Sequence, residues 1–143
     1  MDGPDPPKSP CRLVVFLARE APIGVVLRRG PSAWARLSLW HTDTDRFEHG
    51  QWLGARVYER RSDLSPDGAL FVAFVRKSGG TRRPEQRADS WVAISRPPWF
   101  TALALWFVGG TYYAGSFFTG RQALCTGWGD QPDQGGLPGW LLS

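Results

Sequence analysis

The sequence predicts an all-β domain made mainly of antiparallel strands, with at most one short helix. The 17 Gly and 12 Pro residues are spread along the 143-residue chain and leave few stretches long enough for a helix of average length. Between these breaks, short segments of strand length are apolar or alternate between apolar and polar residues. Eight Trp and eight Phe residues supply large side chains for a core. We therefore expect the strands to form a sandwich or a small barrel.

Most of the expected strands follow one another at short intervals. The clearest alternation lies in residues 35–41, where Leu37 and Leu39 occupy one face of a half-buried strand. Segment 100–107 fits either a strand or about two turns of helix, because its Ala and Leu residues favour helix as much as strand. Strands are expected at 12–17, 23–28, 35–41, 47–52, 56–61, 69–75, 91–95 and 111–118.

The strongest local signal is a turn at residues 65–68. Ser65, Pro66 and Gly68 occupy the first, second and fourth positions, where a type I turn favours them. The run 69–75 follows the turn and is apolar on both faces, which predicts a central strand. A hairpin is therefore predicted around this turn.

The composition along the chain predicts three parts. Residues 1–10 contain several prolines and are expected to form a flexible leader, residues 11–118 a single β domain, and residues 119–143 a poorly ordered or atypical tail. The N-terminus does not have the pattern of a signal peptide, and the longest apolar run, 99–110, is shorter than the ~20 residues of a membrane helix. We therefore expect a cytoplasmic protein that does not contact a membrane.

Two segments resemble parts of β-propeller blades. Residues 63–74 resemble the strand–turn–strand unit of a blade in propellers of the TolB and WD40 kinds. Residues 39–45 resemble the hairpin tip between blade strands, with Trp40 and His41 in place of the usual tryptophan–aspartate pair. A blade takes about 40–45 residues and a closed propeller at least about four blades. The resemblance therefore implies partial-propeller-like sheets.

On a wider scale, residues 11–118 are similar to an uncharacterised bacterial protein family. The similarity lies in residues 58–68, 95–98 and 102–106, and it implies no activity. An incomplete propeller exposes sheet edges that invite pairing with a partner or with a second copy. Alternatively, the strands close into a compact sandwich or small barrel, or the chain is a shortened relative of a larger propeller.

One polar cluster contains the residue types of a metal site. Its members lie within nine residues of each other, and a mixture of imidazole and carboxylate can bind a divalent metal, as a metal-dependent enzyme would require. The alternative is a hairpin tip whose polar side chains face water. The spacing matches no known metal motif, so we predict no metal and no cofactor. The cluster consists of His41, Asp43, Asp45, Glu48 and His49.

Candidate nucleophiles lack a convincing context. Ser65 has no Gly-x-Ser-x-Gly elbow, and only His41 and His49 are available as its base. The turn already explains a serine at this position. Cys11 and Cys125 are expected to be small apolar thiols packed in a core. We therefore predict that the protein is not an enzyme.

The charged residues suggest binding. The net charge is +4, and 15 of the 17 basic residues are Arg. These residues are scattered along the chain and do not form the single basic stripe of a nucleic-acid-binding protein. Protein binding is therefore the main prediction, and nucleic-acid binding is the alternative. Tyr58, Arg60 and Arg61 form a candidate binding group, because Arg offers a planar fork of donors to a phosphate, a carboxylate or a protein. The alternative for this group is an edge strand with cross-strand charge pairs.

The tryptophans and the basic loop complete the candidate residues. Trp52, like Trp34 and Trp99, lies next to a turn and is a candidate surface anchor, because Trp and Arg are favoured at interfaces. The alternative for each of the three is packing in the core or against the turn. Trp91 and Trp106 lie in apolar runs and are expected in the core. A solvated basic loop is expected from Arg76, Lys77, Arg82, Arg83 and Arg87.

Overall fold

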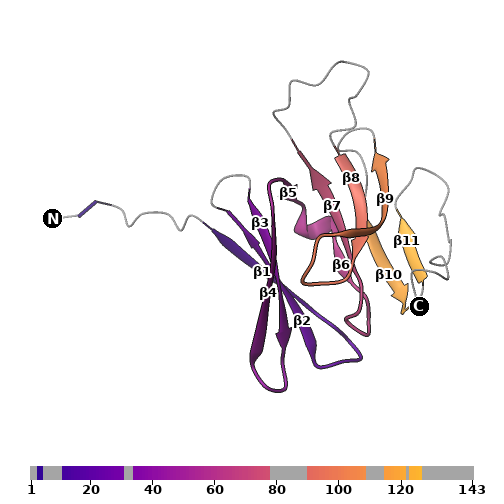
Figure 1. Ribbon diagram of the computed structural model, residues 1–143, viewed down its shortest axis with the longest axis horizontal. Helices are drawn as coiled ribbons and strands as arrows, with labels where there is room; N and C mark the ends of the chain where they lie inside the picture. The colour runs from indigo at the N-terminus through magenta and orange to yellow at the C-terminus, as the bar shows by residue number, and fades with distance from the viewer. Residues whose placement is uncertain are drawn as a thin grey trace, which may run out of the picture.

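The computed structural model describes residues 3–4, 11–30, 34–77, 90–108, 115–121 and 123–126. These residues form three antiparallel sheets (Figure 1). The first sheet has the order β1-β2-β3-β4, and its strands span Arg12–Leu17, Ile23–Arg29, Ala35–His41 and Arg46–Leu53. The prediction of an all-β, mainly antiparallel domain is confirmed.

The second sheet has the order β5-β7-β8-β9, and β6 also pairs with β7. Its strands are β5 (Arg56–Val57), β6 (Asp63–Leu64), β7 (Phe71–Arg76), β8 (Ser90–Ser95) and β9 (Ala102–Val108). The third sheet consists of β10 (Ser116–Gly120) and β11 (Ala123–Thr126). Across the described ranges no sheet closes into a barrel, which leaves the sandwich and the partial-propeller-like sheets of the three expected arrangements.

Segment 100–107, whose sequence fits helix or strand, forms β9. It pairs antiparallel with β8 from Ser90↔Val108 to Ser95↔Ala102, so the ladder and not local propensity decides its conformation. The only helical element in the described part of the chain is the 3₁₀ turn η1 (Glu59–Arg61). At most one short helix was predicted.

The expectation of one continuous strand at 56–61 is wrong. β5 ends at Val57, η1 follows, and β6 resumes pairing with the same neighbour, β7. Ser62 bridges the interruption, because its Oγ donates to Tyr58 O (2.8 Å) and accepts from Phe74 N (3.2 Å). Tyr58 N also donates to Phe74 O (3.0 Å). The backbone groups that leave the β5–β6 strand at η1 therefore find partners on β7 or within the turn itself.

The C-terminal part extends beyond the predicted domain boundary. β10 lies in the expected strand 111–118 and runs on to Gly120, while residues 111–114 are outside the described residues. β11, which the sequence did not predict, lies in the stretch expected to be a tail and pairs with β10. Residues 127–143 and nearly all of the expected leader fall outside the described residues.

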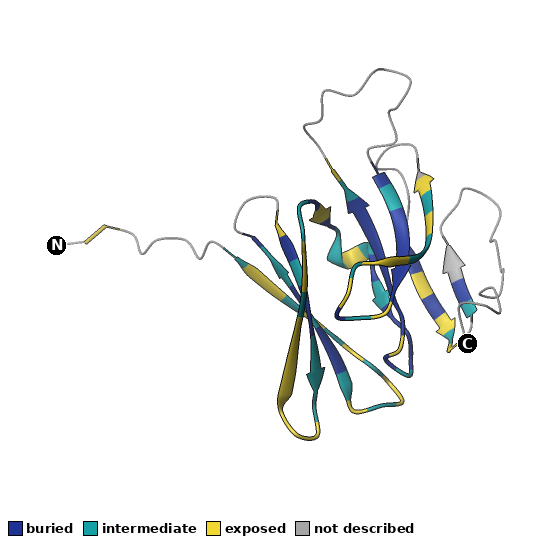
Figure 2. Cartoon of the chain, in the orientation of Figure 1, coloured by how far each residue is buried: buried dark blue, intermediate teal, exposed yellow. Residues whose placement is uncertain are grey.

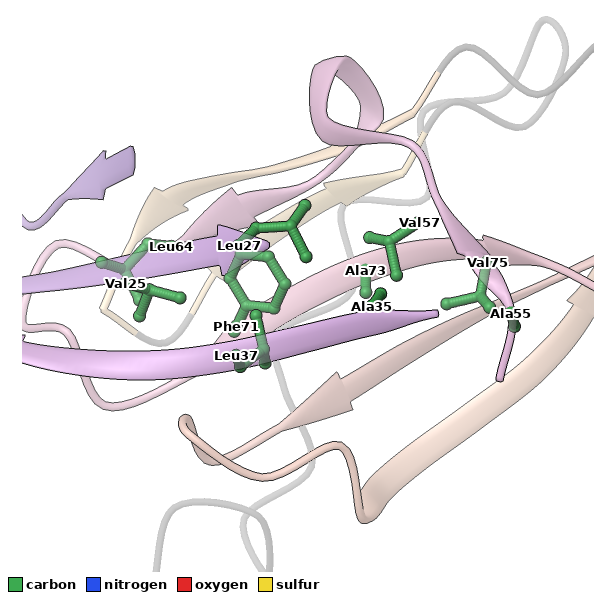
Figure 3. Close-up of a cluster of buried hydrophobic side chains, with 10 residues drawn as sticks. All are labelled: Val25, Leu27, Ala35, Leu37, Ala55, Val57, Leu64, Phe71, Ala73 and Val75. Atoms are coloured by element: carbon green, nitrogen blue, oxygen red, sulfur yellow. The ribbon is translucent and has the colours of Figure 1, made fainter. Parts of the chain in front are cut away.

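Strand β7 forms the centre of the core. Its residues Phe71, Ala73 and Val75 face the first sheet, where they join the side chains of Val25 and Leu37 (Figure 3). Its other face, Val72 and Phe74, packs with β8 against Phe118 and Leu124 of the third sheet. The three sheets therefore stack in chain order, and the second sheet is covered on both faces (Figure 2). The prediction of a central strand is confirmed.

The predicted hairpin turn between β6 and β7 is also confirmed. Gly68 N donates to Ser65 O (2.9 Å), and Gly68 has a φ of +75°, a left-handed conformation that favours glycine. The turn docks on the β1–β2 connection, because Pro66 O accepts from Glu20 N (2.9 Å). It therefore fixes the first sheet against the second.

Candidate interaction surface

The outer face of the first sheet is the face turned away from the core. Strand alternation and the register of β1 to β4 place twelve residues on it in three rows that cross the sheet. A register shift in β4 after His49 brings Trp52 to the same face. The rows are Leu13, Arg28, Arg36 and Trp52; Val15, Val26, Ser38 and His49; and Leu17, Gly24, Trp40 and Phe47.

Large apolar side chains are exposed on this outer face. Leu13, Val15, Leu17, Phe47 and Trp52 are each between 43% and 63% exposed. Much of β1 and β4 is yellow in Figure 2, the colour of exposed residues. Scattered exposed apolar residues are ordinary, whereas large contiguous apolar patches on a soluble protein are typical of interaction sites.

Aromatic rings at both ends of the outer face are held in place. At one end, the Trp40 and Phe47 rings stack with centroids 5.7 Å apart and planes 6° apart, and Trp40 Nε1 donates to Asp45 Oδ1 (3.1 Å). At the other end, the guanidinium carbons of Arg28 and Arg36 lie 5.5 and 5.3 Å from the Trp52 ring centroid. These contacts restrict the rotamers of the rings, which lowers the entropy lost when a partner covers them.

Charge is distributed unevenly along the outer face. Its twelve residues include two Arg and no carboxylate. Carboxylates lie just beyond the opposite end, in the β3–β4 turn, where Asp43 and Asp45 are exposed. The outer face therefore has a cationic end and an apolar middle, and the turn beyond its far end carries Asp43 and Asp45 next to the exposed Arg46.

The structure separates the residues that the sequence grouped as a binding site. Trp52 lies on the outer face, whereas Tyr58 packs edge-on against Phe74 (5.3 Å between centroids) beside the core between the second and third sheets. Arg61 lies 5.5 Å from both of these rings, and Arg60 is exposed on η1. Tyr58 and Arg61 thus lie against one buried ring, that of Phe74, between the second and third sheets, whereas Trp52 lies on the first sheet.

Glu59 in the same segment joins η1 to the first sheet. Its carboxylate pairs with Arg29 (2.5 Å) and Arg12 (3.5 Å). Burial opposes its ionisation, but a backbone hydrogen bond and the two guanidinium groups outweigh burial and hold its pKa below the ordinary value. These ion pairs join two sheets, and they are not the cross-strand pairs expected as the alternative.

The five residues that contain the side-chain types of a metal site do not converge. His41 Nε2 lies 2.7 Å from Glu48 Oε2, whereas His49 Nδ1 lies 2.9 Å from Ser38 Oγ on the outer face. By the register of β3 and β4, the two imidazoles are on opposite faces of the sheet. Within the ranges that the structure describes, no three His, Cys, Asp or Glu residues are placed to hold a metal ion.

Ser65 is fully buried in the hairpin turn. Its Oγ donates to Asp67 Oδ1 (2.7 Å) and accepts from Leu70 N (2.9 Å). Both contacts belong to the turn, so the geometry explains this serine without a catalytic role. Cys11 is half-buried, and Cys125 lies in β11, where its side chain is not among the described ones.

Four further tryptophans lie in the described part of the chain. Trp91 and Trp106 pack against the two core clusters, while Trp34 and Trp99 are about half exposed. Of the basic loop, only Arg76 and Lys77 are in the described part of the chain.

Sequence reasoning missed most of the outer face. The pairing of Arg28 with Arg36 depends on strand register, and the exposure of Leu13 and Leu17 depends on how the sheets stack. A local signal was present in β1, whose residues are apolar on both faces, but a strand covered by two sheets has the same pattern.

Comparisons with protein families, with curated proteins and with solved structures find no match for this chain. Among the described residues, no helix has the length and apolar character needed to cross a membrane.

Proposed function

We propose that this chain is a non-enzymatic protein-binding domain and that it binds through the outer face of the first sheet. The observation that carries the proposal is the set of five large apolar side chains, each 43–63% exposed, on the uncovered face of a sheet whose other face is core. Covering each half-exposed side chain contributes on the order of 1 kcal/mol. Trp52 between two Arg residues adds the residue types that dominate binding energies.

The order of the strands supports a related proposal about architecture. The first sheet is a meander of four strands, and the second sheet has the same plan if β5 and β6 are taken as one interrupted strand. β10 and β11 begin a third sheet. We infer that these are successive blades of an incomplete propeller, in which the outer face of the first blade lacks its neighbour.

The protein-binding proposal is tested with two matched phenylalanines. Phe47 on the outer face is 50% exposed and Phe117 on β10 is 53% exposed, so replacing either by Ser removes a similar surface. Immobilised wild-type and variant chains are incubated with a lysate of the source cells, and the retained proteins are quantified by mass spectrometry. We expect a partner that Phe47→Ser loses and Phe117→Ser keeps. Equal retention by both variants contradicts the proposal.

A second candidate function is the binding of single-stranded nucleic acid. The observation that favours it is the presence of two Arg residues and three aromatic rings on one face, because bases stack on aromatic rings while cations contact the phosphates. Anisotropy of a labelled oligo-dT tests it across a salt series. Contacts from Arg28 and Arg36 predict a log–log salt slope of about −1.4. Absence of binding at low salt excludes this function.

A further inference from the structure

We propose that the partner of the outer face is the same face of a second copy, in a two-fold symmetric dimer. This inference rests on the proposed function and names the protein that is bound. The two-fold axis lies between the paired sheets and runs across the strands. Each strand then lies over the same strand of the second copy with its direction reversed, and the order of the three rows is inverted.

The inverted rows complement each other in chemistry. Leu13 comes to lie over Leu17 of the second copy, and Arg28 over Gly24, which is covered by the Leu17 and Trp40 side chains of its own copy, each 3.2 Å from where a Cβ would lie. In the same rows, Arg36 faces Trp40 and Trp52 faces Phe47, which are a cation–π pair and an aromatic pair. A two-fold interface requires a surface that is complementary to itself, and the three rows meet this condition.

The middle row lies on the two-fold axis, so each of its residues approaches its own symmetry mate. Val15 and Val26 thereby form apolar contacts at the centre of the interface. Ser38 Oγ and His49 Nδ1 already hydrogen-bond each other within one copy (2.9 Å), so burial leaves these two atoms paired. No charged carboxylate or guanidinium is placed on the axis.

Charge favours the inverted orientation over one in which the rows of the two copies run in the same order. Inversion brings Arg36 of each copy next to Trp40 of the other, whose indole is hydrogen-bonded to Asp45. If the rows were not inverted, the Arg28 and Arg36 side chains of both copies would meet at one end with no carboxylate on the face between them. Like charges placed together across an interface disfavour that arrangement.

The size of the outer face sets the expected affinity. Four strands about 4.8 Å apart, with about six residues of ~3.4 Å each, cover roughly 400 Å² per copy. Two copies bury about 800 Å² in plane, and the projecting side chains bring the total near the ~1,000 Å² of a small specific interface. We therefore expect a dimer in the micromolar range, which dissociates on dilution.

The first test measures mass against concentration by sedimentation velocity on the full chain. We expect the mass to rise from 15.9 kDa toward twice that value between roughly 1 and 300 µM, the range that brackets a micromolar dissociation constant. Val26→Asp, which places two carboxylates on the axis, should weaken the dimer at least about ten-fold. Phe117→Ser should leave it unchanged, and thermal melting confirms that each variant is folded. A dimer that Val26→Asp does not weaken overturns the inference.

The second test measures orientation by disulfide cross-linking, in a chain where Cys11 and Cys125 are replaced by Ser. Leu13 and Leu17 are both exposed, so a cysteine at either place does not disturb the core. We expect a mixture of Leu13→Cys and Leu17→Cys chains to form cross-linked heterodimers, and either variant alone to form few. Efficient cross-linking of Leu13→Cys with itself overturns the inverted orientation.

The two proposals fail in different ways. A chain that stays monomeric at the highest concentration overturns the dimer, but Phe47-dependent capture of another protein still supports binding through the outer face. A monomer whose capture of proteins does not depend on Phe47 overturns both.

Discussion

Replacing Ser65 by Ala distinguishes a structural from a chemical role for this serine. The Ser65 hydroxyl is fully buried and makes two hydrogen bonds, one to the carboxylate of Asp67 and one from the amide of Leu70. The substitution removes a hydroxyl without adding bulk. Its effect on the free energy of unfolding therefore measures what the hydroxyl contributes to the turn.

The magnitude follows from the groups that lose a partner. The Leu70 amide stays buried without its acceptor, which costs about 1–3 kcal/mol. The Asp67 carboxylate keeps its bond from Ala69 N (3.1 Å) and is half-exposed, so water replaces most of what it loses. We expect a total loss of about 2 kcal/mol, which lowers the melting temperature by about 4–8 °C for a domain of this size.

Urea unfolding followed by tryptophan fluorescence measures this loss. Ala69→Ser is the control, because Ala69 is exposed in the same turn and its side chain is apolar. We expect this control to unfold within about 0.5 kcal/mol of the wild type. If Ser65→Ala is as stable as the control, the hydroxyl does not hold the turn and the structural explanation of Ser65 is wrong.

Three further substitutions test contacts between the sheets. Asp63→Asn should destabilise the chain by about 1–2 kcal/mol in a urea titration. Asp63 Oδ2 accepts from Phe118 N (2.8 Å) and Oδ1 accepts from Leu64 N, and the nitrogen of the Asn side chain cannot accept a hydrogen bond in either place. An unchanged midpoint of urea unfolding contradicts this prediction. Gly50→Ala should cost about 1–3 kcal/mol by thermal melting, because a Cβ there would lie 1.8 Å from the carbonyl oxygen of Pro98. A variant as stable as the wild type would show that this close approach is absent. Glu59→Gln should lower the stability of the chain at pH 7 and make that stability fall less steeply in acid. Folding lowers the Glu59 pKa, so the ionised carboxylate stabilises the folded chain above about pH 4.3. This stabilisation is lost as the pH falls toward the folded pKa. An acid profile that is the same with and without the substitution refutes this last prediction.

Local patterns predicted the elements that local chemistry governs. The turn at Ser65 and Gly68 was predicted because its residue types suit only a few backbone conformations, and the alternation in 35–41 identified β3 because one face of that strand is core. The break at η1 was not predictable in this way. It depends on Ser62 reaching the amide of Phe74, a residue twelve positions away, and that contact exists only once β7 is in place.

Of the outer face, the sequence predicted one member, Trp52, as a surface anchor. It placed Trp52 with Tyr58, Arg60 and Arg61, because these residues are neighbours in the chain and share the residue types of binding sites. The structure places Trp52 with Arg28 instead, because strand pairing brings residues together by register and not by sequence distance. Protein binding and a cytoplasmic location stay predictions.

By itself, the sequence determined that this protein is all-β and where most of its strands begin and end. Those properties follow from spacing and turn chemistry over a few residues, which a local pattern records. Only the tertiary structure decided which apolar faces are buried. β1 and β7 are both apolar on both faces, yet β7 lies between two sheets while β1 leaves Leu13 and Leu17 exposed. Burial depends on what lies across the sheet, and the residues of a single strand do not record that.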